Sequence, residues 1–321
     1  MDGILCQTYG VEVEMYHISR ANAARCLAES LTRITGTLWE ARYKGGVYDA
    51  WLVRPSNMPS PVWMIERDSS IVAPRAEQVE LVTPVLSWDD MPTLQQVLRD
   101  LRKAGARSDP SHTCGIHVHV GADGHTARTL RNLSNIMASH EALLVKALNL
   151  DTSRVITYAK PVSPVFLAAV NRERPETLDD LKRVWYDAYD DGIDGSYFHY
   201  HESRYHMLNL HSFFSGKGIE FRLFQFDDYD ENAPKGQKGG IHAGRLKAFV
   251  QLCLALSYRA KVVRSSSAKV LHTDNPRYAM RCWLLRLGFI GDEFATARTV
   301  YTRRLQGDCS FRHGRPHHGP S

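Results

Sequence analysis

Four short segments of the sequence place a charged or imidazole side chain at every second position, between apolar residues. They are GVEVEM (10–15), VELV (79–82), GIHVHV (115–120) and GIEFRLF (218–224). Side chains alternate between the two faces of a β-strand, so each segment predicts one polar and one apolar face. The polar positions hold only Glu, His and Arg, namely Glu12, Glu14, Glu80, His117, His119, Glu220 and Arg222. An antiparallel sheet with one face in water is the simpler alternative. A solvated face usually also carries Lys, Thr, Ser and Gln, so the composition favours a shared cleft.

These segments concentrate negative charge if their polar faces meet. Glu12, Glu14, Glu80 and Glu220 supply four carboxylates, and Asp68 of the segment ERDSS is a candidate fifth. Two such charges roughly 5 Å apart repel each other by on the order of 3 kcal/mol at an effective dielectric constant near 20. Divalent cations can offset this repulsion. A carboxylate-rich site with one imidazole suits Mg²⁺ or Mn²⁺, whereas Zn²⁺ favours more His or Cys ligands.

The remaining patterns predict a mixed α+β chain without internal repeats. A period of two indicates strands at 11–15, 63–65, 78–82, 115–120, 205–213 and 219–226. A period of 3.6 indicates helices at 20–34, 93–103, 126–148, 177–189, 243–263, 276–286 and 292–305. Ser19 and Thr126 are the predicted N-caps of the first and third of these helices.

The two strands at 205–226 predict a β-hairpin, which gives a register to test. In that register His211 lies opposite Arg222, and Asn209 lies opposite Phe224. We therefore expect Asn209 and His211 to face the same cleft as Glu220.

The length and composition of the chain limit its possible domain organisation and cellular location. With 321 residues, 43% of them hydrophobic, the chain can bury a large core. We expect one catalytic domain at 1–306, in which the charged, Gly- and Pro-containing loop 227–240 is a candidate lid, followed by a disordered tail at 307–321. The sequence contains no apolar run of the roughly 18 residues that a membrane span needs and no secretion signal, and its six cysteines are scattered. These features predict a cytoplasmic protein with no membrane partner.

Six pieces of the chain together resemble a known family. YGVEVEM, RDSS, VELVTP, CGIHVH, RYHMLNLH and GIEFRLF stand in family order between residues 9 and 226. In this combination the chain resembles the amidoligases of the glutamine synthetase and glutamate–cysteine ligase superfamily. No single piece is specific, since ExE and HxH alone are weak motifs.

The resemblance implies a curved, mainly antiparallel sheet like the catalytic sheet of glutamine synthetase, with helices packed on its convex face. It implies that ATP and two or three Mg²⁺ ions bind on the concave face, with Mn²⁺ as an alternative. A carboxylate substrate would attack ATP to form an acyl phosphate, and an amine would then displace phosphate to leave an amide or isopeptide bond. The substrate class that it suggests is an amino acid, a peptide or a cell-wall fragment. Superfamily relatives often form rings, so the resemblance leaves an oligomer open.

The resemblance also implies roles for single residues. Glu12, Glu14, Glu80, His119 and Glu220 match metal ligands, and Asp68 matches a ligand or a support of the metal site. Arg222 and Glu220 match the catalytic pair, Arg222 being the arginine that neutralises phosphate. His117 is expected to orient a carboxylate or contact ATP. Asn209, His211 and Arg204 are candidates for binding substrate carboxylates.

Two hypotheses from other functional classes remain open. In the first, His117 and His119 bind Zn²⁺ in a metal-dependent hydrolase, which predicts metal in the purified protein and turnover without ATP. In the second, the protein has no catalytic activity and binds nucleic acid through its basic C-terminal region. The net charge of +5 is much weaker than that of a dedicated nucleic-acid-binding protein, so the composition argues against the second reading.

Overall fold

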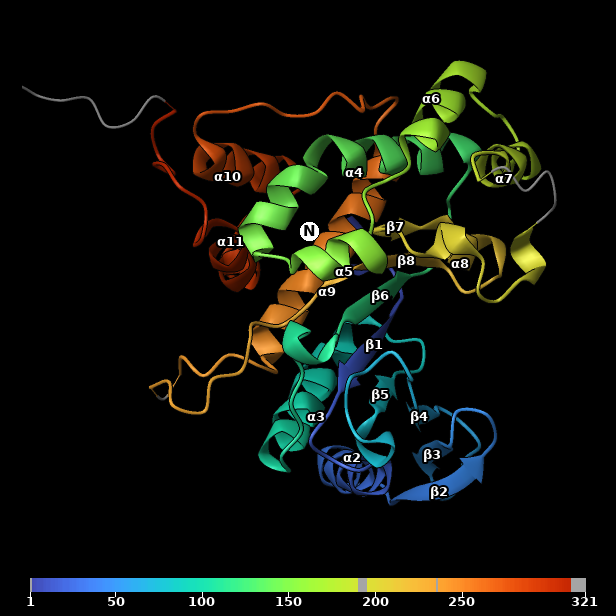
Figure 1. The fold of residues 1–321 in the computed structure, drawn as a ribbon, viewed down its shortest axis with the longest axis vertical. Coiled ribbons are helices and arrows are strands. Elements are labelled where there is room, and N and C mark those ends of the chain that lie inside the picture. Colours follow the sequence, from blue (N-terminus) through green and yellow to red (C-terminus); the bar gives the residue numbers. More distant parts are fainter. Residues whose placement is uncertain (1, 190–194, 235, 313–321) are drawn as a thin grey trace, which may run out of the picture.

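The computed structural model describes residues 2–189, 195–234 and 236–312. Within them, every paired strand joins one open antiparallel sheet of eight strands, in the order β2-β3-β4-β5-β1-β6-β8-β7 (Figure 1). The strands are β1 (Tyr9–Met15), β2 (Trp39–Gly45), β3 (Ala50–Pro55), β4 (Trp63–Glu66), β5 (Val79–Val82), β6 (Ile116–Val120), β7 (Leu208–Asn209) and β8 (Ile219–Phe224). The predicted polar strands β5, β1, β6 and β8 are consecutive neighbours at the centre of this sheet.

Helices pack on the apolar face of the sheet. Helix α2 lies against β2, β3 and β4, α9 lies against β6, and α3 packs beside both helices (Figure 1). The helices are α1 (Asp2–Leu5), α2 (Arg20–Thr35), α3 (Met91–Lys103), α4 (Ala127–Leu148), α5 (Thr152–Thr157), α6 (Pro164–Glu173), α7 (Leu178–Asp187), α8 (Leu210–Phe214), α9 (Ala243–Val262), α10 (Pro276–Arg286) and α11 (Ala295–Thr302). Because this layer covers the apolar face, Val13, Leu81, Val118 and Phe221 are fully buried, and the acidic face is left for a cleft.

The α+β prediction with an antiparallel sheet is confirmed, and so are both predicted N-caps. The Ser19 side chain accepts a hydrogen bond from the backbone N–H of Asn22 at the start of α2, and Thr126 accepts one from Thr129 at the start of α4. Such caps satisfy backbone donors that have no partner within the helix. Helix α2 ends at Gly36, whose φ of 71° is a conformation that glycine adopts without strain.

The predicted strand at 205–213 is wrong. Only Leu208–Asn209 pairs with β8, and the chain then turns into helix α8. The Asn209 side chain accepts a hydrogen bond from the backbone N–H of Ser212, so it caps the helix where the alternation of apolar residues predicted an extended chain. Asn209 consequently lies opposite Glu220, not opposite Phe224. The predicted register, with His211 opposite Arg222, fails for the same reason.

Several elements of the structure were not among those predicted from the sequence. Strands β2 and β3 form a hairpin at one edge of the sheet, and α5 and α6 follow α4. In β2, Arg42, Tyr43 and Lys44 are consecutive exposed residues, so the strand lacks the alternation that marks a half-buried strand.

The loop and the tail have distinct anchors. In the candidate lid, the Gly240 backbone N–H donates to the carbonyl of Asp227 at 2.8 Å, which closes the base of the loop. Asn275 donates from its side chain to the carbonyl of Phe311 at 2.9 Å, while the part of the predicted disordered tail at 313–321 lies outside the described residues. No helix among the described residues is long and apolar enough to cross a membrane.

Candidate active site

The sheet register brings the polar side chains of separate strands face to face. On one side of β1, Glu14 lies opposite Glu80 of β5, which in turn lies opposite Glu66 of β4. On the other side, Glu12 of β1 lies opposite His117 of β6. Residues directly opposite each other in antiparallel strands have Cβ atoms about 4.5–5.5 Å apart. The side chains therefore meet in one cleft, whose larger chamber has a volume of about 620 Å³.

Strand β8 completes the cleft through a local irregularity. His119 of β6 lies opposite Glu220, but the pairing shifts beyond Val118, so that two residues of β8, Arg222 and Leu223, are opposite His117 alone. Such a β-bulge re-aims the side chains of the strand on which it occurs. Arg222 and Glu220 both remain on the cleft side, where their side chains contact each other.

Glu220 and its partners form what we call the balanced end of the cleft, made of His119, Asn209, Glu220 and Arg222. Arg222 Nη1 donates to Glu220 Oε1 at 2.5 Å, and Asn209 Nδ2 donates to Glu220 Oε2 at 2.6 Å. Burial raises the pKa of the Glu220 carboxyl, but Arg222, His119 and His117 outweigh it and lower this pKa to about 2. Both oxygens of this buried carboxylate therefore have donors, and its charge is compensated.

Glu12 lies between the two histidines at the middle of the cleft. Its Oε2 lies 2.9 Å from His117 Nδ1, and its Oε1 lies 3.2 Å from His119 Nε2. Burial raises the pKa of Glu12, but the charge of His119 and the hydrogen bond from His117 together hold it well below its usual range. Burial lowers the pKa of His119, and Glu12 and Glu220 more than reverse this, raising it to about 9.

The opposite part of the cleft, the unbalanced end, is made of Glu14, Glu66, Asp68 and Glu80. In the described part of the chain, no basic side chain lies within 4.0 Å of the carboxylates of Glu66, Asp68 or Glu80. Burial, followed by the charges of Glu12, Asp68, Glu14 and Glu66, raises the pKa of Glu80 well above its usual range. A carboxylate in such a place is stabilised either by a proton or by a cation.

Three groups of side chains in the cleft have the composition of a metal site. They are Glu12–His119–Glu220, Glu12–Glu80–His117 and Glu14–Asp68–Glu80, and in each group one potential ligand atom per residue lies within 4.8 Å of the others. The sites share Glu12 and Glu80, so they form a continuous row across the sheet. Oxygen-dominated ligand sets of this kind suit Mg²⁺ or Mn²⁺.

Two buried nitrogen atoms test whether the residues fit a metal. Nε2 of His117 and Nε2 of His119 are buried and make no hydrogen bond among the described residues. Each still lies near a carboxylate oxygen, His117 Nε2 at 3.7 Å from Glu14 and His119 Nε2 at 3.2 Å from Glu12. A buried polar atom without a partner costs free energy. Nitrogen and oxygen atoms that face each other without hydrogen-bond geometry fit a shared cation, so the residues fit a divalent metal.

The predicted residues all lie in or beside this cleft. Arg204 and His211 line a smaller adjoining chamber of about 190 Å³, together with Asn209, His119 and Glu220. His211 Nδ1 hydrogen-bonds to the Tyr186 hydroxyl at 2.8 Å. Burial, and then the charges of His201 and Arg204, lower the pKa of His211 to about 4, so it is neutral at pH 7. Asp68 accepts a hydrogen bond from the backbone N–H of Ser70 at 2.7 Å, which fixes its carboxylate in the cleft wall.

The larger chamber contains four charged residues that were not predicted from the sequence, namely Glu66, Arg67, Arg154 and Lys217. Glu66 belongs to the segment ERDSS and ends strand β4 at the position opposite Glu80. Arg154 lies on α5, a helix that the sequence did not predict. The Asp151 side chain, which caps α5, was the available signal for that helix.

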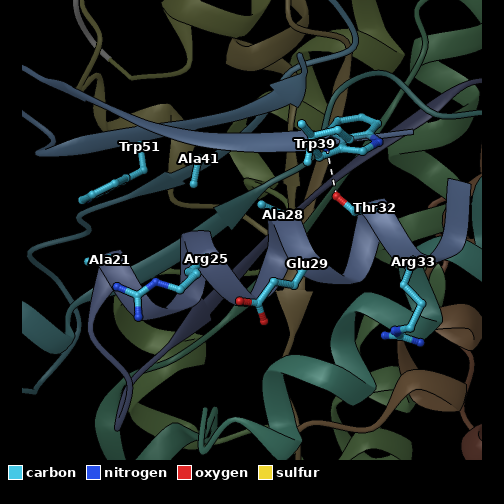
Figure 2. Close-up of a pocket in the computed structure, with 10 residues that line it drawn as sticks. Ala21, Arg25, Ala28, Glu29, Thr32, Arg33, Trp39, Ala41 and Trp51 are labelled. Atoms are coloured by element: carbon cyan, nitrogen blue, oxygen red, sulfur yellow. Dashed lines mark hydrogen bonds between the residues drawn. The ribbon is translucent and has the colours of Figure 1, made fainter. Parts of the chain in front are cut away.

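A second hollow, of about 510 Å³, lies between α2 and strands β2 and β3. Figure 2 shows Ala21, Arg25, Ala28, Glu29, Thr32 and Arg33 of α2 beside Trp39, Ala41 and Trp51 of the edge strands. The Trp39 backbone N–H donates to the Thr32 hydroxyl at 2.9 Å and ties the strand to the helix. None of the three metal-type groups found in the described residues includes a residue of this hollow.

Comparisons with known proteins add to this geometry. The model of a family described as "Putative amidoligase enzyme" matches residues 6–257. Among solved structures, a bifunctional glutathione synthetase from Pasteurella multocida is similar, with 12% sequence identity and a TM-score of 0.42. The alignment covers 94% of this chain and 47% of that protein, so the chain spans about half the length of this relative. No curated protein sequence matches the chain significantly.

Proposed function

Because the chain belongs to this family of amidoligases, we propose that it is an ATP-dependent carboxylate–amine ligase that forms an amide or isopeptide bond. The observation that carries the proposal is a row of three clusters of carboxylate and imidazole side chains across four neighbouring strands. Arginines lie in the same cleft. Nucleotide phosphates need this combination of divalent ions and fixed positive charge. Candidate substrates are an amino acid, a peptide or a cell-wall fragment.

The proposed reaction has two steps that balance without a redox partner. An oxygen of the substrate carboxylate attacks the γ-phosphorus of ATP, the bond to ADP breaks, and an acyl phosphate forms. The substrate amine then attacks the acyl carbon, the bond to phosphate breaks, and the amine loses a proton as the amide forms. The first step requires that the cleft hold two anionic groups, the substrate carboxylate and the triphosphate of ATP, in contact, which water alone does not favour.

The metal-binding residues in this proposal are Glu12, Glu14, Asp68, Glu80, His117, His119 and Glu220. Bound Mg²⁺, or Mn²⁺, would supply the positive charge that neutralises the phosphate oxygens. The chain's own residues hold these ligands in place. His117 Nδ1 orients Glu12, and Arg222 and Asn209 orient Glu220. Arg222 lies beside the reacting groups, but its charge is partly offset by Glu220.

The smaller chamber is the proposed place for the polar part of a substrate. Asn209, His211 and Arg204 line it together with the exposed Lys217. Since His211 is neutral at pH 7, it would bind a carboxylate as a hydrogen-bond donor, and Arg204 would supply the charge.

The six cysteines are free thiols, which suits the reducing cytoplasm that we propose as the compartment of the protein.

The geometry disfavours the zinc hydrolase reading. His117 and His119 belong to different groups, and no metal-type group found in the described residues contains both.

The nucleic-acid-binding hypothesis is weakened as well. Arg303 and Arg304 pair with Asp227 at 2.9 Å, and Arg298 donates to two backbone carbonyls, so these basic side chains are already engaged within the chain.

The test is release of phosphate from ATP in the presence of Mg²⁺ and pools of amino acids and amines. We expect stimulated release and a new amide product from the wild-type protein, and loss of both in Glu80→Gln. Glu176→Gln, which changes an exposed glutamate outside the cleft, is the matched control. Stimulated release that survives Glu80→Gln would overturn the proposed site. Turnover of an amide substrate without ATP, together with tightly held zinc, would favour the hydrolase.

A further inference from the structure

Arg154 is a buried arginine in the wall of the acidic cleft. It lies on α5, its exposed fraction is 5%, and it lines the larger chamber together with Glu14, His117 and Arg222. Its Nη2 donates to the backbone carbonyl of Arg222 at 2.9 Å. No other side-chain hydrogen bond of Arg154 occurs within the described residues, and its buried Nε has no partner there.

The charge of Arg154 is also uncompensated at close range. In the described part of the chain no carboxylate lies within 4.0 Å of its guanidinium, whereas Arg222 contacts Glu220 at 2.5 Å. Buried arginines are normally paired, because removing a cation from water is costly. The closest comparison outside the cleft is Arg245, which is 4% exposed and pairs with Asp227. Of these three buried arginines, Arg154 alone has no carboxylate partner.

The backbone at Gly115, just before strand β6, leaves room for the Arg154 side chain. A Cβ atom at Gly115 would lie 1.9 Å from Arg154 Nη2 and 2.1 Å from its Cζ. Only glycine at this position lets the guanidinium lie directly against the backbone just before Ile116. The same glycine donates its N–H to Glu14 Oε2 at 2.6 Å, which places the guanidinium next to one of the proposed metal groups. Gly115 thus leaves room for the Arg154 guanidinium and also holds the Glu14 carboxylate near it.

We propose that Arg154 is the principal oxyanion-binding arginine of the cleft and contacts a phosphoryl or carboxylate group of the substrates directly. A guanidinium presents a fork of donors that matches two oxygens of either group. Arg222 then mainly holds Glu220, and Arg154 supplies buried positive charge to a chamber that Arg67, Arg204 and Lys217 also line. This inference deepens the proposed function and rests on it for the identity of the substrates, while the binding of an oxyanion does not depend on ligation.

The primary test measures anion binding by the full-length protein, in the presence of Mg²⁺, by calorimetry and thermal shift. Inorganic phosphate and pyrophosphate probe a phosphoryl site, and succinate and glutarate probe a carboxylate site. We expect Arg154→Met to weaken the binding of the probe that the wild-type protein prefers by tenfold or more, because a charge-assisted hydrogen bond is lost. Whichever class of probe loses affinity identifies the group that Arg154 contacts.

Two further variants separate binding from folding. Arg245→Met removes an equally buried arginine outside the cleft, and we expect it to leave anion affinity unchanged. Arg154→Lys keeps the charge without the fork, and we expect affinity between those of wild type and Arg154→Met. Unchanged anion affinity in a folded Arg154→Met protein would overturn the proposal. So would failure of both Arg154 variants to fold while Arg245→Met folds, since that result would assign Arg154 a structural role.

The outcomes also distinguish this inference from the proposed function. If the wild-type protein binds an oxyanion through Arg154 but forms no amide from ATP, the inference holds and the ligase proposal fails. If amide formation is observed and Arg154→Met leaves its kcat and KM unchanged, the ligase proposal holds and the inference fails.

Discussion

The two ends of the acidic cleft have the same kind of side chain in opposite electrostatic surroundings. At the balanced end, Glu220 has a donor on each carboxylate oxygen and a pKa lowered to about 2. At the unbalanced end, Glu80 is surrounded by other carboxylates and has a raised pKa. The difference shows which part of the site is complete without a ligand. The protein supplies the counter-charge for Glu220 itself and leaves that for Glu80 to a proton or a bound cation.

The largest expected effect is at the balanced end. Glu220→Gln removes the partner of buried Arg222 and leaves its guanidinium uncompensated. We expect the free energy of unfolding to fall by about 3–5 kcal/mol in the metal-free protein, measured by urea denaturation in EDTA. As a control, Glu293→Gln breaks a partly exposed ion pair with Lys247 and should cost less than about 1 kcal/mol. Equal effects of the two substitutions would contradict the view that the balanced end is electrostatically complete.

At the unbalanced end we expect a substitution to raise, not lower, the free energy of unfolding of the metal-free protein. Glu80→Gln removes one of several mutually repelling carboxylates, so the metal-free protein should gain about 1–3 kcal/mol. The same variant should lose the rise in Tm that we expect Mg²⁺ to give the wild-type protein. Differential scanning fluorimetry with and without Mg²⁺, alongside Glu176→Gln, measures both effects. A Glu80→Gln protein that is less stable without metal would show that the two ends do not differ in this way.

The pH dependence of stability should separate the two ends in EDTA. The folded pKa of Glu80 is raised above its unfolded value near 4.5, so the folded state binds the extra proton and stability should fall as pH rises above 4.5. The folded pKa of Glu220 is lowered to about 2, so its contribution is present above pH 4.5 and is lost as pH falls toward 2. Each group contributes a slope of at most about 1.4 kcal/mol per pH unit.

Urea denaturation between pH 2.5 and 6 can assign these slopes. Glu80→Gln should reduce the slope above pH 4.5, to which the raised pKa values of Glu66 and Glu141 also contribute. Glu220→Gln should reduce the slope below pH 4.5, to which the lowered pKa of Glu12 also contributes. His119, whose pKa is raised to about 9, contributes stability that is lost only as pH rises from 6.5 to 9, outside this range. If either variant changed the slope on the other side of pH 4.5, the two ends would have to be treated as one coupled unit.

The smallest expected effect is that of salt. Raising NaCl from 0.05 to 0.5 M shortens the Debye length from roughly 14 Å to 4 Å and weakens repulsion among the partly exposed carboxylates of the unbalanced end. We expect less than about 1 kcal/mol of stabilisation in the metal-free wild-type protein and a smaller gain in Glu80→Gln. A gain of the same size in both proteins would place the salt effect elsewhere on the surface.

The sequence by itself determined which side chains face the cleft. Alternation along a strand is a local property of the backbone, so Glu12, Glu14, Glu80, His117 and His119 could be assigned to one face before any pairing was known. The N-caps Ser19 and Thr126 could be predicted for the same reason, since a cap bonds to residues only two or three positions further along the chain. The local rule failed at 208–214, where the Asn209 side chain made capping a helix an alternative to extending the strand.

Only the tertiary structure decided which charges meet and which stay unpaired. The register sets Glu66 against Glu80, and the bulge in β8 keeps Arg222 on the cleft side with Glu220. Arg154 reaches the cleft from a separate helix because Gly115 leaves room for it. These relations depend on which strands become neighbours and in what register. Burial of the apolar face across the whole sheet sets both, and no local pattern in the chain encodes them.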